Sequence, residues 1–274
     1  MVKNMKSMKK MLIIAVIAII AVVCVSSVVS AGLFDFFGSN SNDKEVNLAA
    51  AASLKNVYDE KLIPMFEQKH PGVKVTPTYA SSGDLQSQIE NGLKADVFMS
   101  ASNKQMNNLA KEDLVDNKTN VQFLENKVVL IVPKNASTNI SSFEDLKNMS
   151  GTIAIGNPDS VPAGQYGKEV LTSLGIWDSV ESKLSLGTDV TAVLNQVAQG
   201  SAECGIVYAT DAKSNPNVKV VCEAPNGTLK TPVIYPVAEL KNPEHPEAAK
   251  EFMEFLKTKE AKDVFVEYGF TIHE

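Results

Sequence analysis

The chain has 274 residues, of which 44% are apolar and 21% charged, an ordinary globular composition that excludes wholesale disorder and a collagen-like architecture. Its formal net charge is −6, and all 26 of its cationic side chains are Lys. An acidic chain without Arg is a poor candidate for nucleic-acid binding, and it cannot clamp a carboxylate or a phosphate with a guanidinium group. At about 150 residues per domain, the length favours two domains.

The N-terminal segment has the pattern of an export signal. Four Lys precede an unbroken apolar run of 15 residues, 11–25, and residues 29–31 are small enough for cleavage. We predict that residues 1–31 are a cleaved signal peptide. A retained membrane anchor is the alternative, because residues 11–31 reach the roughly 20 residues that span a bilayer.

Other features near the N-terminus refine this prediction. A lipid-attachment site at Cys24 is disfavoured, because Val23 stands where Gly or Ala is expected. Residues 32–44 are predicted to be a flexible polar linker. Without residues 1–31 the formal charge becomes −10. We expect the remaining chain at the outer face of the cytoplasmic membrane or in a periplasm.

Beyond residue 44, short apolar segments alternate with segments of helical periodicity. The predicted strands are 46–51, 73–79, 95–100, 127–133, 152–156, 203–208, 218–223 and 231–238, and the predicted helices are 54–69, 84–91, 104–111, 165–174, 190–199, 246–257 and 260–267. This alternation predicts an α/β fold with mostly parallel sheets flanked by helices.

Two extended segments, 127–133 and 231–238, are suited to crossing between domains. We therefore predict a two-lobed α/β protein with a ligand cleft between its lobes. Lobe I comprises residues 45–128 plus 234–274, and lobe II comprises residues 129–233.

Several predicted strand-to-helix joints contain small or hydroxyl-bearing residues, at the position where open α/β sheets bind ligands. These joints lie at 49–54, 79–84, 161–166, 187–190 and 205–208. Each joint alone has an ordinary explanation, since Ser53 is a natural N-cap, Tyr208 suits a core, and Asp84 and Asp189 suit capping carboxylates. Together they offer hydroxyls and helix-terminal N–H groups to a small oxyanion.

The chain resembles the molybdate/tungstate-binding protein of ABC importers, a type II periplasmic-type binding protein. The matching segments are AAASL (50–54), YASSG (79–83), ADVFMSA (95–101), IAIGNPDSVPAGQYGKEVL (153–171), GIVYATDA (205–212), VIYPVA (233–238) and YGFTI (268–272). The resemblance covers residues 45–272, and the VPAG and GIVY segments are its most specific parts.

The resemblance implies that the oxyanion is held by Ser53, Ser82, Ala163, Val190 and Tyr208, with Ser81 as the substitute for Ser82. The metal of the oxyanion would be contacted only through its oxygens, in a tetrahedral mode with neutral donors. No cofactor is implied. The implied partners are the oxyanion and the transmembrane subunits of an ABC permease. We expect a monomer that binds no nucleic acid.

Two alternatives remain open at this stage. A sulfate or thiosulfate binder would use the same neutral donors in a smaller cavity. An exported serine hydrolase is disfavoured, because Ser53-Leu54-Lys55 lacks the S-x-x-K spacing and no G-x-S-x-G motif occurs. The three His residues, His70, His245 and His273, are scattered and form no metal motif.

Two further sets of residues have both a structural and a functional interpretation. Cys204 and Cys222 could form a disulfide after export, but each lies in an apolar run and is more simply a small buried strand residue. Asn-x-Ser/Thr sequons occur at Asn117, Asn135, Asn139, Asn148 and Asn226, in polar turns that need no glycan to explain them.

Overall fold

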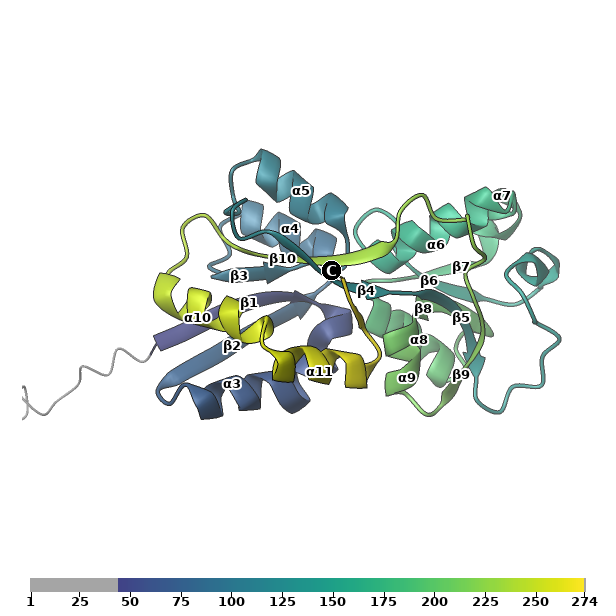
Figure 1. Cartoon of the computed structure of the whole chain (residues 1–274). Helices are drawn as coiled ribbons and strands as arrows, with labels where there is room; N and C mark the ends of the chain where they lie inside the picture. Colours follow the sequence, from purple (N-terminus) through teal and green to yellow (C-terminus); the bar gives the residue numbers. More distant parts are fainter. Residues whose placement is uncertain (1–43, 274) are drawn as a thin grey trace, which may run out of the picture. The chain divides into compact units, whose positions relative to one another are not determined.

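The computed structural model describes residues 44–273, in which helices flank two separate β-sheets (Figure 1). The predicted signal segment 1–31 and residues 32–43 of the predicted linker lie outside the described residues. We call the elements around the first sheet lobe I and those around the second sheet lobe II. The two-lobed α/β fold predicted from the sequence is confirmed.

The sheet of lobe I has six strands in the order β11-β4-β10-β3-β1-β2. They are β1 (Lys44–Ala51), β2 (Val73–Ala80), β3 (Val97–Met99), β4 (Val121–Asn126), β10 (Val233–Glu239) and β11 (Thr271–Ile272). The helices of this lobe are the continuous run η1 (Ala52–Leu54), α2 (Lys55–Val57), η2 (Tyr58–Leu62) and α3 (Ile63–Lys69), then α4 (Ser82–Glu90), α5 (Asn103–Lys111), α10 (Pro246–Leu256) and α11 (Lys259–Tyr268).

The sheet of lobe II has five strands in the order β7-β6-β8-β5-β9. They are β5 (Val128–Pro133), β6 (Ile153–Gly156), β7 (Leu184–Gly187), β8 (Cys204–Tyr208) and β9 (Val218–Glu223). The helices are α6 (Pro162–Ser173), α7 (Trp177–Val180), α8 (Val190–Ala198) and α9 (Ala209–Ser214), with short 3₁₀ turns η3 (Glu144–Asn148) and η4 (Glu181–Lys183).

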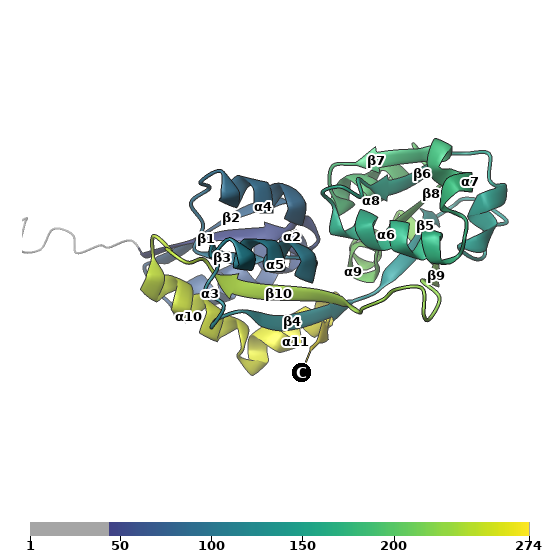
Figure 2. The same ribbon diagram turned by 90° about the horizontal axis from the view of Figure 1, so that it is seen from above.

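The chain passes from lobe I to lobe II between β4 and β5 and returns between β9 and β10 (Figure 2). Both sheets are mixed rather than mostly parallel. β1 is parallel to β2 and β3, and β6 is parallel to β7 and β8. The strands next to the crossings, β5 and β10, pair antiparallel with their neighbours. The predicted boundaries after residues 128 and 233 lie one residue into β5 and β10, and the exact division into lobes stays a prediction.

Most predicted elements lie within a few residues of observed ones, but several short ones escaped prediction. β4, β7, β11, α7 and α9 are absent from the sequence-based assignment, because they are short or, like β4 (VQFLEN), interrupted by polar residues. The expectation that Ser53 is an N-cap is wrong. The cap of η1 is Ala51, which makes no side-chain cap hydrogen bond, and Ser53 lies inside the turn.

Aromatic side chains join the first and last parts of the chain within lobe I. Phe66 meets Phe252 edge-to-face at a centroid distance of 5.0 Å, and Tyr58 meets Phe265 in the same way at 6.0 Å. All four rings are fully buried. Burial of rings this large is among the strongest contributions to a core, so α10 and α11 are held firmly on the 52–69 helical segment.

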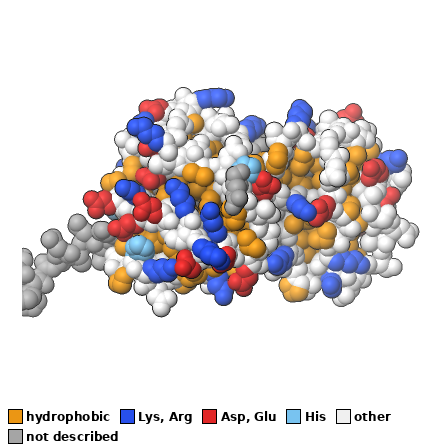
Figure 3. All heavy atoms as spheres, in the orientation of Figure 1, with side chains coloured by type: hydrophobic (Ala, Val, Ile, Leu, Met, Phe, Trp, Pro, Cys, Tyr) orange, Lys and Arg blue, Asp and Glu red, His pale blue; other side chains and the backbone are white. Residues whose placement is uncertain are grey.

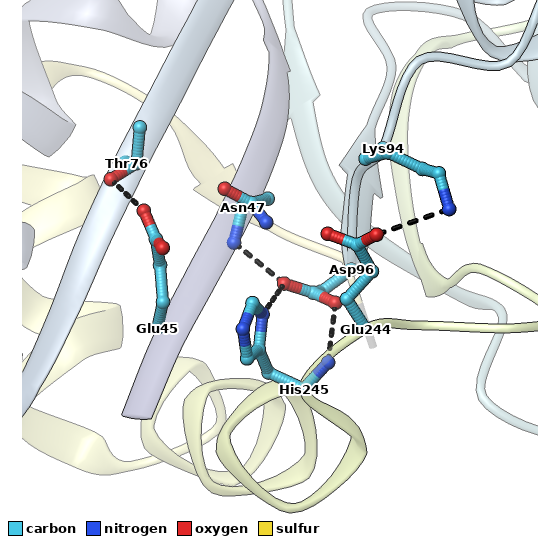
Figure 4. Close-up of polar contacts among 7 residues, drawn as sticks. All are labelled: Glu45, Asn47, Thr76, Lys94, Asp96, Glu244 and His245. Carbon is cyan, nitrogen blue, oxygen red and sulfur yellow. Dashed lines mark hydrogen bonds and ion pairs between the residues drawn. The ribbon is translucent and has the colours of Figure 1, made fainter. Parts of the chain in front are cut away.

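A buried carboxylate fastens the start of α10 to the sheet (Figure 4). Asp96 is 0% exposed, and its two oxygens accept the backbone N–H groups of Asn47 at 2.7 Å and His245 at 2.9 Å. The His245 ring Nδ1 lies 3.1 Å from the same carboxylate. Every contact of this group is used in joining β1, β3 and α10, so we assign the Asp96 cluster to stability.

Cys204 and Cys222 are not joined by a disulfide. Cys204 is buried, and desolvation raises the pKa of its thiol to about 12, which keeps the thiol protonated and unreactive. Cys204 therefore fits the interpretation as a small buried strand residue, whereas Cys222 lies on a strand but is only half-buried.

Charged side chains of both signs are interspersed on the face seen in Figure 3. Among the described residues, oppositely charged side chains form ion pairs, including Lys127 with Glu223 at 2.9 Å and Lys241 with Asp113 at 2.9 Å. This face has no continuous cationic stripe of the kind that a nucleic-acid backbone requires. Across residues 44–273, no helix combines the length and the apolar character needed to cross a membrane.

Candidate functional site

The five residues that the resemblance selects line one cavity between the two lobes. Lobe I contributes Ser53 and Ser82, and lobe II contributes Ala163, Val190 and Tyr208. The rest of the lining is Ala51, Ala52, Ser81, Ala101, Val161 and Pro162. The space open to the centre of a water molecule is about 10 Å³, room for about one water. An anion with four oxygens is larger, so its binding requires the cavity walls to move apart from this arrangement.

The two adjacent serines at the start of α4 have different roles. Ser81 is the N-cap, and its Oγ accepts the backbone N–H of Asp84 at 3.1 Å. Ser82 is the first helical residue, fully buried, and its Oγ accepts the backbone N–H of Ala101 at 2.9 Å. A backbone N–H can only donate, so the Ser82 hydroxyl keeps its own proton for another acceptor.

Ser53 lies in the turn that follows β1. Its Oγ is 2.9 Å from the hydroxyl of Tyr235, which is fully buried on β10. The neighbouring Lys55 forms an ion pair with Asp59 at 2.5 Å instead of contacting Ser53. A Ser–Lys nucleophile of the hydrolase type is therefore not assembled here.

Lobe II contributes helix N-termini. Ala163 and Val190 lie in the first turns of α6 and α8, where backbone N–H groups have no partner within the helix. The N-terminus of α6 has no side-chain cap, whereas Asp189 caps α8 by accepting the N–H of Ala192 at 2.8 Å. The positive ends of both helix dipoles favour an anion at this cavity.

The VPAG segment owes its glycine to close packing. A Cβ at Gly164 would lie 1.9 Å from the carbonyl oxygen of Gly156, at the end of β6. The first turn of α6 can therefore approach the strand end only without a side chain at this position. That approach is what brings the Ala163 amide to the cavity.

Tyr208 is a neutral donor at the end of β8. Its hydroxyl lies 3.5 Å from the carbonyl oxygen of Ala101 in lobe I, which is a long hydrogen bond. Desolvation raises the pKa of the Tyr208 hydroxyl well above its ordinary value near 10, so the proton stays on the oxygen. No lysine contributes to the cavity lining.

A larger cavity of about 250 Å³ shares Ser53 and Ala52 with the first, but it is the poorer candidate for an anion. Its lining includes Asp211, which is 6% exposed. Desolvation raises the pKa of this carboxyl to about 7, so it carries negative charge for part of the time at neutral pH. An anion is repelled by that charge and finds fully neutral donors in the small cavity.

The lobes touch around the small cavity. The Gly83 N–H of lobe I donates to the carbonyl oxygen of Ser160 in lobe II at 2.9 Å. The Gln105 side-chain amide donates to the Gln165 side-chain oxygen at 3.3 Å. These contacts flank Ser82 and Ala163, so the approach of the lobes and the approach of the donors occur together.

The three His residues are placed away from this cavity. His245 contacts Asp96, His273 contacts Glu125, and His70 stacks on Phe66 at 4.4 Å. Within the described residues, no three His, Cys, Asp or Glu side chains come together as a metal site. Sequence reasoning missed Tyr235 and Asn126. Tyr235 contacts Ser53 directly, and Asn126 contacts Tyr235. The VIYPVA segment contained Tyr235 but gave no signal of its role.

Comparison with known proteins gives consistent relationships. A family model described as "Bacterial extracellular solute-binding protein" matches residues 46–271. A Bacillus subtilis (strain 168) protein named as an ABC transporter substrate-binding lipoprotein is 40% identical over 235 residues, covering 85% of this chain and 89% of that protein. The molybdate-binding protein ModA of Haemophilus influenzae is 36% identical over 250 residues, covering 90% of this chain and 96% of that protein.

A solved structure, the periplasmic molybdate-binding protein of Azotobacter vinelandii, has the same fold. It superposes with a TM-score of 0.75 at 22% identity, over 84% of this chain and all of that one. With the family match spanning nearly all of the described residues, the chain belongs to the bacterial extracellular solute-binding protein family.

Proposed function

We propose that this protein captures molybdate or tungstate outside the cytoplasmic membrane and delivers it to an ABC permease, without catalysing a reaction. The observation that supports this most strongly is the convergence of Ser53, Ser82, Ala163, Val190 and Tyr208 on one cavity between the lobes. The relative named as a molybdate-binding protein supports the choice of anion. We further propose that the protein acts as a monomer, needs no cofactor and is exported.

The chemistry of the lining favours an anion that only accepts hydrogen bonds. Hydroxyls and helix-terminal N–H groups present protons, and no carboxylate stands among the lining residues to accept one. Phosphate keeps a proton at neutral pH, and that proton would be left unpaired in such a site. Molybdate, tungstate and sulfate have no proton to place, so the chemistry of the lining does not choose among them, and the choice of molybdate or tungstate rests on the relative named as a molybdate-binding protein.

The test is a calorimetric titration of the purified protein with molybdate, tungstate, sulfate and phosphate. We expect tight, saturable binding of molybdate and tungstate, much weaker binding of sulfate and almost none of phosphate. Equal affinities for sulfate and molybdate would refute the assignment and favour the sulfate or thiosulfate class. Steady product formation from an ester or phosphoester would favour the alternative of an exported serine hydrolase.

A further inference from the structure

Buried hydrogen bonds connect the Ser53 hydroxyl to the junction between the lobes. Ser53 Oγ lies 2.9 Å from Tyr235 Oη, and Asn126 Nδ2 donates to the same Oη at 3.2 Å. The Asn126 amide nitrogen also donates to Thr210 Oγ1 at 2.9 Å. Tyr235, Asn126 and Thr210 are 0%, 9% and 6% exposed. Bulk water therefore offers these groups no alternative partners.

The direction of each hydrogen bond follows from the orientation of Asn126. Its Oδ1 accepts the backbone N–H of Lys127 at 2.9 Å, which fixes which end of the amide faces which way. The Nδ2 that faces Tyr235 can only donate, so the Tyr235 oxygen accepts. The Tyr235 proton then needs an acceptor of its own. The Tyr208 hydroxyl is also a neighbour of Tyr235, but the oxygen within hydrogen-bond distance in residues 44–273 is Ser53 Oγ at 2.9 Å, so we assign the Tyr235 proton to it.

Once Tyr235 donates to it, Ser53 has its own proton left for the cavity. We propose that Asn126 and Tyr235 are positioning residues that fix the Ser53 hydroxyl as a donor toward the bound oxyanion. This inference rests on the proposed function. Ser82 is fixed in the same sense by a different donor-only group, the backbone N–H of Ala101 at 2.9 Å. Both serines of lobe I therefore keep a proton to donate to the bound anion.

These residues lie where the two lobes are joined, so the direction of the Ser53 proton depends on how the lobes are arranged. Asn126 ends β4, where the chain leaves lobe I, and Tyr235 lies on β10, where the chain returns. Thr210 belongs to α9 of lobe II, two residues after Tyr208. The Asn126 amide thus contacts a residue of each lobe, and a change at the junction changes what Ser53 can donate to.

The test is a double-mutant cycle on molybdate affinity, measured by calorimetry with the purified protein. Tyr235→Phe removes only the hydroxyl, and we expect binding about tenfold weaker because Ser53 loses its fixed direction. Ser53→Ala should weaken binding by about ten- to a hundredfold. If Tyr235 acts through Ser53, the double variant binds within about twofold of Ser53→Ala alone. A structural role of Tyr235 would instead multiply the two losses, and that result would overturn the proposal.

A matched control is Tyr58→Phe, which removes a fully buried hydroxyl of lobe I that donates to Met99 Sδ at 3.0 Å, away from the cavity. The molybdate affinity of the Tyr58→Phe variant should equal that of the unaltered protein, even if its melting temperature is lower. Should Tyr235→Phe fail to fold, Asn126→Ala in both Ser53 backgrounds gives a second cycle with the same expectation. An unaltered protein that binds none of the four anions refutes the proposed function and this inference together. Normal molybdate binding with multiplied losses refutes the inference alone.

Discussion

Gly83→Ala should separate closure of the lobes from the folding of either one. Gly83 is the second residue of α4, and its N–H donates to the Ser160 carbonyl oxygen across the cleft. A Cβ at this position would lie 2.3 Å from that oxygen and 2.7 Å from the Ser160 Cα. The obstacle is backbone, which cannot rotate away as a flexible side chain can. The variant therefore obstructs the contact between lobes while leaving α4 itself free to form.

The expected magnitude follows from two opposing effects. In the separated lobes, replacing a helical Gly by Ala stabilises the helix by up to about 1 kcal/mol. In the closed arrangement, overpacking of this kind costs about 1–3 kcal/mol. Ser82 and Ala163 must contact the anion from opposite lobes, so binding requires the lobes to approach each other. The overpacking cost of that approach therefore weakens the free energy of binding. At about 1.4 kcal/mol per factor of ten, molybdate affinity should fall by about five- to a hundredfold.

Three measurements on the purified protein check this reasoning. Calorimetry should give the weaker affinity, thermal unfolding without ligand should give an unchanged or higher melting temperature, and small-angle scattering should show less compaction with molybdate than the unaltered protein. Ser87→Ala, an exposed position on the same helix, controls for helix propensity and should bind normally. Unaltered affinity and full compaction in Gly83→Ala would show that the Gly83–Ser160 contact has no part in the bound form.

Three further predictions concern other residues. Ser81→Ala should lower the melting temperature, because it removes a helix cap worth about 1 kcal/mol, and should change molybdate affinity little. Ser82→Ala should weaken molybdate binding about ten- to a hundredfold. A larger affinity loss in Ser81→Ala than in Ser82→Ala would reverse the two assignments. Asp96→Ala should cost about 3 kcal/mol in urea unfolding, because two buried N–H groups lose their acceptor, and molybdate affinity measured under folded conditions should stay the same. The Asp211 carboxyl keeps its proton in the folded state up to about pH 7 but loses it near 3.8 when unfolded, so its ionisation lowers stability progressively as pH rises between these values. Asp211→Asn should therefore add up to about 4 kcal/mol above pH 7 and almost nothing below pH 4, and a pH-independent gain in unfolding free energy would contradict this cause.

The local elements of the fold could be predicted from the sequence where periodicity was strong and long. The α10 and β9 segments were predicted to within a residue, because an apolar face or an apolar run marks each of them. The β4 strand was missed, since polar residues interrupt its apolar pattern. The mixed direction of both sheets was also missed, because strand direction depends on how the chain crosses and not on local composition.

The five site positions could be predicted only through the resemblance, since each joint taken alone looked like an ordinary cap or core residue. The different roles of Ser81 and Ser82 depend on the contact of Ser82 with Ala101, 19 residues away. The contacts of Tyr235 with Ser53 and Asn126 span 182 and 109 residues. No local pattern signals partners at such separations, so the direction of the hydroxyl protons emerges only from the folded chain.

The direction of those protons explains how an acidic chain without Arg could hold a dianion. Without residues 1–31 the formal charge is −10, so long-range electrostatic repulsion opposes capture of an anion, and the attraction must come from short-range groups. A hydroxyl that is free to rotate can donate or accept, and it distinguishes poorly between an anion and its protonated form. Ser82 and Ser53 each lose that freedom, through the Ala101 N–H and through Tyr235. Hydroxyls whose direction is already fixed lose little rotational freedom when the anion arrives, so neutral groups in a water-excluding cavity can supply the stabilisation that a guanidinium supplies elsewhere.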